Sequence, residues 1–339
     1  MSEVREGLRR ESEVVMAWTA SGTAKVIGSL AAFFAGASFG LGGAASQIVG
    51  AQGFSIMHIT AIQYVCAAVI LGVLVLVKYR PHMNAKEVAS LCGVGALSVL
   101  SNLSYYLAID LLSVGQAVAI QFQYVWIVVA IQSVVERKRP SAWIIAATVL
   151  VLFGTLFGSG LVDEVMTGAG SLSFDPLGIV FAVLCACCYA GFIYLNGRVA
   201  TEHQPVTRTF FMMVAGSVIM AFVAPDFYTG GCDVVGLLPG GIVMGLVMGV
   251  IPCVGLAMAT KRLPGGIVAI LSASELPVAV LAGCLLLGEQ ATPLTIFGVV
   301  VICVSIVLSQ MEELKATRAG AVGDASGGAL ADAATSPKA

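Results

Sequence analysis

Glu275 is the residue whose type and setting most clearly suggest chemistry, because it is a carboxylic acid inside a long apolar stretch. It lies near the middle of the apolar run 265–287, two residues before Pro277. A charge at the centre of a membrane helix costs about 2.5 to 3.5 kcal/mol on insertion scales. Proline has no backbone N–H, so we expect the carbonyl of Ala273 to be a free acceptor. An acid beside an interruption in helical hydrogen bonding indicates part of a solute pathway.

Two interpretations of Glu275 follow from this setting. In the functional one, which we favour, it binds a substrate ammonium or accepts a proton during transport. In the structural one, it is a protonated or hydrogen-bonded residue that caps the backbone break at Pro277. Ser272 and Ser274 flank it in the sequence, so their hydroxyls are candidate donors to its carboxyl group.

Other polar side chains inside apolar runs are candidates for lining a substrate cavity. Gln123 and Tyr124 lie in the middle of the fourth run, and uncharged polar groups of this kind suit a zwitterionic or neutral polar solute. The alternative is hydrogen bonding between helices, worth about 0.6 kcal/mol on average in membranes. The same choice between cavity lining and ordinary packing applies to Asn102, Tyr105, Gln63, Tyr64 and Tyr189.

The composition identifies an integral membrane protein. Of the 339 residues, 58% are hydrophobic and only 11% are charged, against about 25% charged in soluble domains. The net charge of −2 gives no indication of a nucleic-acid partner. His58, His82 and His203 are far apart and show no metal-ligand spacing with cysteine or carboxylate, so we expect neither a metal site nor a cofactor.

Ten apolar runs are long enough to cross a bilayer as helices, which predicts an all-α fold with ten transmembrane helices. Short links between most runs favour neighbouring antiparallel helices. The runs are 25–45, 56–77, 87–108, 114–134, 141–159, 177–195, 207–224, 240–260, 265–287 and 293–310.

The distribution of charge predicts the orientation of these helices. With the N-terminus on the cytoplasmic side, alternation of ten spans places all 17 Lys and Arg residues at cytoplasmic ends. Cytoplasmic loops are enriched in Lys and Arg, so we expect a multi-pass protein of the cytoplasmic membrane with both termini inside. This count also leaves no Lys or Arg for the interior.

The two halves of the chain resemble each other. Gly115 aligns with Gly265, and the pattern Glu-x-x-x-Pro occurs at residues 136–140 and again at 289–293. Five spans per half is an odd number, so the halves enter the membrane from opposite sides, as in many secondary transporters. We therefore predict two inverted five-helix repeats at 24–160 and 176–310, after a cytoplasmic segment at 1–23. The last residues, 311–339, are rich in Ala, Gly, Ser and Asp, which predicts a disordered cytoplasmic tail.

Several motifs resemble those of the drug/metabolite transporter superfamily with EamA-type repeats. They are Lys-Arg-Leu-Pro-Gly-Gly at 261–266, Glu-Leu-Pro at 275–277, Leu-Gly-Glu at 287–289 and Gly-Val-Val-Val-Ile at 298–302. The resemblance covers roughly residues 25 to 310. It implies a ten-helix transporter that exports or exchanges small metabolites across the cytoplasmic membrane.

We expect a secondary carrier for a small polar metabolite, such as an amino acid or an amine-bearing compound, that works by alternating access. Its expected partners are the substrate, the lipid bilayer and, as a candidate coupling ion, a proton. The absence of an interior cation disfavours phosphorylated substrates, and no glycine-rich loop ends in Lys-Ser or Lys-Thr, so the chain does not hydrolyse ATP. One alternative is an intramembrane enzyme, for which Ser159 offers a weak nucleophile without a histidine at matching depth. Another is a non-transporting scaffold or sensor. The sequence leaves the oligomeric state open.

Overall fold

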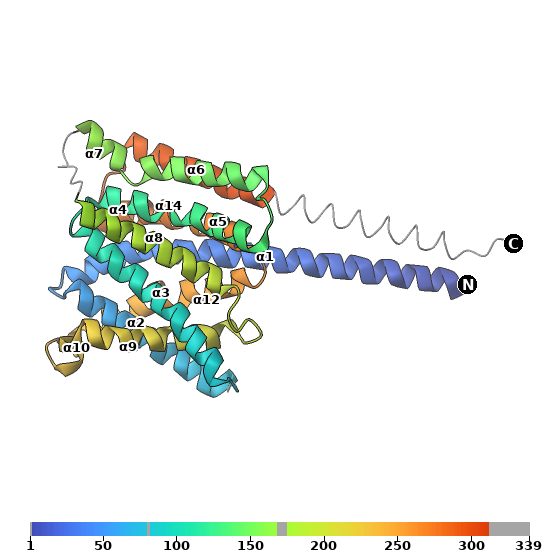
Figure 1. The fold of residues 1–339 in the computed structure, drawn as a ribbon, viewed down its shortest axis with the longest axis horizontal. Helices are drawn as coiled ribbons and strands as arrows, with labels where there is room; N and C mark the ends of the chain where they lie inside the picture. Colours follow the sequence, from blue (N-terminus) through green and yellow to red (C-terminus); the bar gives the residue numbers. More distant parts are fainter. Residues whose placement is uncertain (1, 80–81, 168–174, 312–339) are drawn as a thin grey trace.

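The computed structural model describes residues 2–79, 82–167 and 175–311, and within these ranges the chain forms helices and no strand (Figure 1). The expected disordered tail, apart from Met311, lies outside the described residues. In the described part, nine helical stretches are long and apolar enough to span a membrane. They are Gly22–Gly50 of α1 (Ser2–Gly50); α2 (Ile56–Leu74) with η1 (Val75–Tyr79); α3 (Ala85–Ile109); α4 (Val114–Gln121) with α5 (Tyr124–Glu136); α8 (Pro176–Asn196); α9 (Pro205–Val223); α11 (Val234–Met244), η2 (Gly245–Val250) and α12 (Ile251–Thr260); α13 (Gly265–Ser272), α14 (Glu275–Ala282) and η3 (Gly283–Leu287); and the C-terminal helix Pro293–Met311.

One further span, the fifth in chain order, is a bent pair of helices. α6 (Ala142–Gly158) and α7 (Leu161–Thr167) meet at an angle of 43° and together satisfy the same test of length and hydropathy. A further short helix, α10 (Pro225–Thr229), joins α9 to α11. The expected all-α membrane fold is confirmed, and the protein is a multi-pass membrane protein.

Two spans are broken near their centres, and the breaks occupy corresponding places in the two halves. The fourth span is interrupted at residues 122–123, between α4 and α5, and the ninth at 273–274, between α13 and α14. α4 begins at the end of the bundle that carries Asp110, whereas α13 begins at the opposite end, after Lys261. The two broken spans therefore run in opposite directions, as an inverted repeat requires.

The backbone at the ninth-span break differs from the sequence expectation. The carbonyl of Ala273 is not free, because the N–H of Leu276 donates to it at 3.3 Å. The N–H of Ala273 donates to Ile270 and that of Ser274 to Leu271, so the chain tightens to three-residue turns here. The missing N–H of Pro277 is thus accommodated by a tighter turn, and no backbone acceptor is left at Ala273.

α1 packs closely against this break. A Cβ atom on Gly36 would overlap the Ser272 carbonyl, and one on Gly40 would overlap the Glu275 carbonyl. Small residues allow helix backbones to approach in this way. The hydroxyl of Ser274 strengthens the contact by donating to the carbonyl of Phe33 at 2.7 Å. The backbone of α1 therefore packs directly against the segment that carries Glu275 and fixes its position.

The two ends of the bundle differ in charge, and we call them the acidic end and the basic end. The acidic end comprises the links at 51–55, 110–113, 159–160, 224–233 and 288–292, and the basic end those at 82–84, 137–141, 197–204 and 261–264. At the acidic end, Asp226 accepts a hydrogen bond from His58 at 2.6 Å, and this bond holds the pKa of Asp226 below its ordinary value.

Contacts between the two halves hold the basic end together. Arg198, after α8, donates to the carboxylate of Glu136 at the end of α5 at 2.7 Å. The amide oxygen of Gln132 in α5 accepts from the N–H of Gly266 in α13 at 2.9 Å. The elements of the two halves are thus joined at the basic end.

Arg208 corrects the expectation that no cation lies in the interior. It sits in the first turn of α9, near the basic end, but its side chain is fully buried. Its Nη2 donates to the backbone carbonyl of Asn196 and, at 3.0 Å, to the Oδ1 of the same residue. Nε and Nη1 of Arg208 have no hydrogen-bond partner among the described residues. Asn196 is therefore the main polar partner of a buried charge.

This arrangement predicts that Asn196→Ala destabilises the protein by about 2 kcal/mol, because a hydrogen bond to a charged group is worth about 1.5 to 3 kcal/mol. Asn196→Asp supplies a carboxylate to the same guanidinium and is expected to retain the stability of the wild type. Thermal unfolding of the purified variants in detergent measures both effects. If the alanine variant unfolded at the wild-type temperature, the pair would not be stabilising.

Candidate functional site

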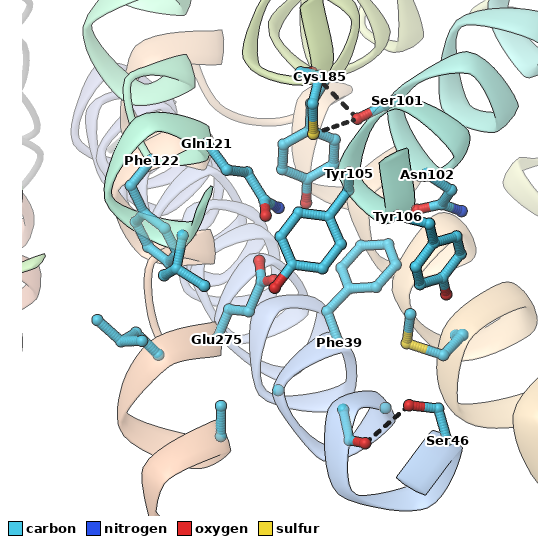
Figure 2. A pocket seen from close by; sticks show the side chains of 18 of the residues that line it. Phe39, Ser46, Ser101, Asn102, Tyr105, Tyr106, Gln121, Phe122, Cys185 and Glu275 are labelled. Carbon is cyan, nitrogen blue, oxygen red and sulfur yellow. Dashed lines mark hydrogen bonds between the residues drawn. The ribbon is translucent and has the colours of Figure 1, made fainter. Parts of the chain in front are cut away.

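An inner cavity of about 160 Å³ lies between the broken spans and the middle of α1, α3 and α8 (Figure 2). Its polar lining includes Ser46 of α1, Ser98, Ser101, Asn102 and Tyr105 of α3, Gln121 of α4, and Glu275 of α14. Its aromatic lining consists of Phe39, Tyr105, Tyr106, Phe122 and Tyr189. The cavity therefore combines one carboxyl group with a ring of aromatic side chains.

A second, outer cavity of about 560 Å³ continues toward the acidic end. The two cavities share lining residues, among them Gly40, Tyr105 and Leu276. Asp110, at the end of α3, and Glu289, after η3, line the outer cavity and are exposed. A path therefore leads from the acidic end to Glu275.

Glu275 stands at the start of α14, immediately after the break in the ninth span. Its Oε2 atom is shielded from solvent and has no hydrogen-bond partner among the described residues. Figure 2 shows Tyr105 and Gln121 projecting from α3 and α4 toward its carboxyl group. A buried acceptor without a partner is costly. A proton or a bound cation would relieve this cost.

The path is closed on the side that faces the basic end. Tyr124 is completely buried on the basic-end side of the cavity. The centroid of its ring lies 4.6 Å from that of Tyr189, and the two rings are packed edge to face. The Tyr124 hydroxyl donates to the carbonyl of Ala269 at 3.4 Å. Phe192, one turn after Tyr189 in α8, is also fully buried. Within the described part of the chain, these buried aromatic side chains separate the site from the basic end in this conformation.

Comparison with protein families identifies this architecture. The model of the EamA-like transporter family matches the chain twice, over residues 26–159 and 176–311. The chain belongs to the EamA-like transporter family. Membership places it in the drug/metabolite transporter superfamily and makes it a transporter, which confirms the resemblance seen in the sequence motifs.

A solved structure supports the fold of this EamA-like transporter. A protein described only as "Crystal structure of protein" superposes with a TM-score of 0.67 at 15% sequence identity, covering 84% of this chain and 98% of that one. At this identity the likeness concerns the fold alone. A search of curated proteins gave no match.

Four of the residues that the sequence analysis proposed for the site line the inner cavity. They are Glu275, Asn102, Tyr105 and Tyr189, from three different helices. Asn102 is partly engaged, because its Nδ2 donates to the hydroxyl of Tyr64 at 2.8 Å. The Tyr189 hydroxyl is buried without a partner among the described residues. The structure thus brings together side chains up to 173 positions apart in the sequence.

The other six proposed residues lie outside the cavity lining. Gln123 is occupied within its own helix segment, where Nε2 donates to Ala119 and Oε1 accepts from Trp126. Gln63 and Tyr64 are buried in α2, with Tyr64 packed against Gly216. Tyr124 forms part of the closed side described above.

Ser272 and Ser274 complete the six. The expected hydrogen bonds from their hydroxyls to Glu275 are absent, because Ser272 donates to the carbonyl of Val268 and Ser274 to that of Phe33. Hydroxyls in membrane helices commonly satisfy backbone acceptors in this way. Both serines therefore stabilise the backbone around the break.

Gln121 was not proposed and lies on the cavity in place of Gln123. The two residues stand on either side of the break at 122–123, where the helical register is reset. The presence of both glutamines in an apolar run indicated a polar site in the fourth span. Because the sequence does not show where the helix breaks, Gln123 was preferred for its position at the middle of the span.

One group of potential metal ligands differs from the expectation based on spacing. At the basic end, Glu87, Glu202 and His203 place ligand atoms within 4.8 Å of one another. His203 Nε2 lies 3.3 Å from the Glu87 carboxylate, which also accepts from the N–H of Asn84 and so caps α3. These contacts connect α3 to the α8–α9 link, far from the cavities, and a local hydrogen-bonding role accounts for them.

Proposed function

We propose that this EamA-like transporter moves a small polar metabolite by alternating access, as an exporter or exchanger, with the inner cavity as its substrate site. The candidate substrates are amino acids and amine-bearing compounds. The observation that carries the proposal is the shielded and unpartnered Oε2 of Glu275 at the closed end of a cavity that opens at the acidic end.

The arrangement of the two halves supports alternating access. The cavity lies between broken spans that run in opposite directions, and the same halves are joined by hydrogen bonds at the basic end. Breaking those contacts while closing the acidic end would expose the site to the other side. Discontinuous helices around a midplane site are the usual framework for this motion.

We further propose that the acidic end faces the outside and the basic end the cytoplasm of a cell membrane. The described residues at the acidic end carry no Lys or Arg, whereas Arg137, Lys138, Arg198 and Lys261 gather at the basic end. Cytoplasmic loops carry the excess of Lys and Arg in membrane proteins. In this proposed orientation the N-terminus lies in the cytoplasm and the conformation is outward-open.

The two alternative functions receive less support. An intramembrane hydrolase would need a base near Ser159, but the cavity-lining residues that the structure describes include no histidine, and the Ser159 hydroxyl donates to the carbonyl of Leu156. A scaffold or sensor would need a solid bundle, whereas the third and fourth spans border a cavity.

Counterflow in proteoliposomes tests the proposal. Vesicles loaded with an unlabelled solute are diluted into a trace of the labelled solute, and a carrier is expected to accumulate the label transiently above its outside concentration. The panel comprises amino acids, primary amines and quaternary amines, with protein-free vesicles as the control. A folded, correctly reconstituted protein that showed no counterflow with the entire panel would contradict the proposal.

A further inference from the structure

The charges along the path to Glu275 are all of one sign. Asp110 and Glu289 line the outer cavity and Glu275 lines the inner one. No Lys, Arg or His occurs among the described residues that line either cavity. A cleft lined by charges of one sign concentrates ligands of the opposite sign. A solute that carries a carboxylate would meet three carboxylates and no cationic partner.

The walls of the inner cavity suit the apolar part of a cation. Phe39, Tyr105, Tyr106, Phe122 and Tyr189 line it, and the rings of Phe39 and Tyr189 meet edge to face at 6.0 Å. The faces of aromatic rings attract ammonium groups, and the attraction is stronger where the groups are desolvated. Aromatic rings around one carboxylate are the elements of a site for an organic ammonium.

The dimensions set an upper limit on the ammonium group. A volume of 160 Å³ corresponds to that of about five water molecules in the liquid. It accommodates a small substituted ammonium, and the remainder of the solute can extend into the outer cavity of 560 Å³.

On these observations, and resting on the proposed function, we propose that the substrate is an organic monocation without a carboxylate, an arylalkylamine or small alkylammonium, whose nitrogen pairs with Glu275. The amino acid that corresponds to such an amine carries an additional carboxylate, and the negative charges along the path repel it. The cation replaces the proton that an isolated Glu275 would retain, so one proton leaves the carboxyl group as each cation binds, and the charge of the site is unchanged.

Among the described residues, the ionisable groups that interact with Glu275 include no second carboxyl group. Tyr105 of α3, Tyr124 of α5, and Cys185 and Tyr189 of α8 lie close enough to interact with it electrostatically. The part of α1 that lines the cavity contributes Phe39, glycines and Ser46, none of them ionisable. All of the neighbouring groups are phenols or thiols, which are neutral near pH 7 in their ordinary state.

Matched ligands test the inference. Binding of phenethylamine, phenylalanine, 3-phenylpropionate and tetramethylammonium to the purified full-length protein is measured by titration calorimetry at pH 7.5, and proton release is obtained by repeating each titration in buffers of different ionisation enthalpy. We expect phenethylamine to bind at least tenfold more tightly than phenylalanine, 3-phenylpropionate not to bind, and amine binding to release about one proton. Glu275→Gln is expected to lose at least tenfold in amine affinity and the proton release. Glu202→Gln, which removes an exposed carboxylate outside both cavities, serves as the control.

The outcomes separate this inference from the proposed function. Counterflow of phenylalanine with equal or tighter binding than phenethylamine would overturn the assignment to monocations and leave the transporter intact. Amine binding through Glu275 without counterflow of any solute would support the site and contradict the transport proposal. Undiminished amine binding by Glu275→Gln would show that Glu275 does not take part in binding the amine.

Discussion

Glu275→Gln is expected to reduce the rate of counterflow at least 100-fold for any solute that the wild type exchanges. Glutamine has nearly the same shape and can hydrogen-bond, but it carries no charge and binds no proton. A 100-fold loss corresponds to about 2.7 kcal/mol, within the range of about 2 to 5 kcal/mol that truncating one partner of a buried hydrogen-bonded charge pair costs in binding. The measurement is initial counterflow rate in proteoliposomes with matched protein content.

The same variant separates the two interpretations of Glu275. If its carboxyl group served only to cap the broken ninth span, glutamine would satisfy the same backbone groups and transport would continue. Glu275→Asp keeps the charge on a shorter side chain and is expected to retain part of the activity. Wild-type exchange by Glu275→Gln would rule out a role for the charge.

Much of the fold follows from one-dimensional patterns in the sequence. Transmembrane runs are recognised by length and hydropathy alone, because the bilayer imposes the same requirement on every span. Glu275 could be recognised as a candidate site residue for a related reason. A carboxylate in an apolar run is costly, and such residues usually have a function. Features that depend only on local composition could therefore be predicted from the sequence.

The direction in which a side chain points was less accessible. Helical periodicity assigns faces only while the helix is continuous, and the breaks at residues 122–123 and 273–274 reset it. That is why Gln121, and not Gln123, lies on the cavity, and why Ser272 and Ser274 bond to the backbone.

Contacts between distant parts of the chain were inaccessible for another reason. Arg208 falls in the first turn of a helix at the basic end, a position that usually lies in water, but the packing of the bundle buries it completely. Its partner Asn196 belongs to the preceding helix and carries no signal of this role. Such pairs depend on the three-dimensional arrangement, which neither hydropathy nor charge counting describes.

Gly40→Val is the second variant expected to have a large effect. A Cβ atom at this position would overlap the carbonyl oxygen of Glu275 and lie 2.9 Å from the N–H nitrogen of Ala279. Backbone atoms cannot rotate away, so α14 must shift, and the carboxyl group of Glu275 shifts with it. Overpacking of this kind typically costs about 1 to 3 kcal/mol. We expect counterflow to fall at least 30-fold and amine affinity to fall in parallel.

Two other glycines show whether the loss arises from the position of Glu275 or from packing in general. Gly93 is exposed in α3, and a Cβ atom added there would have no neighbouring atom within 4 Å. Gly93→Ala is therefore expected to leave counterflow unchanged and not to lower stability, since alanine favours a helix more than glycine does. Gly298→Ala would overlap the backbone of Gly154 and Gly158, where the C-terminal helix crosses α6. It is expected to lower the unfolding temperature while retaining amine binding, because this crossing does not touch the carbonyl of Glu275. If Gly298→Ala and Gly40→Val lost amine binding equally at equal stability, the close approach of α1 would have no particular part in positioning the acid.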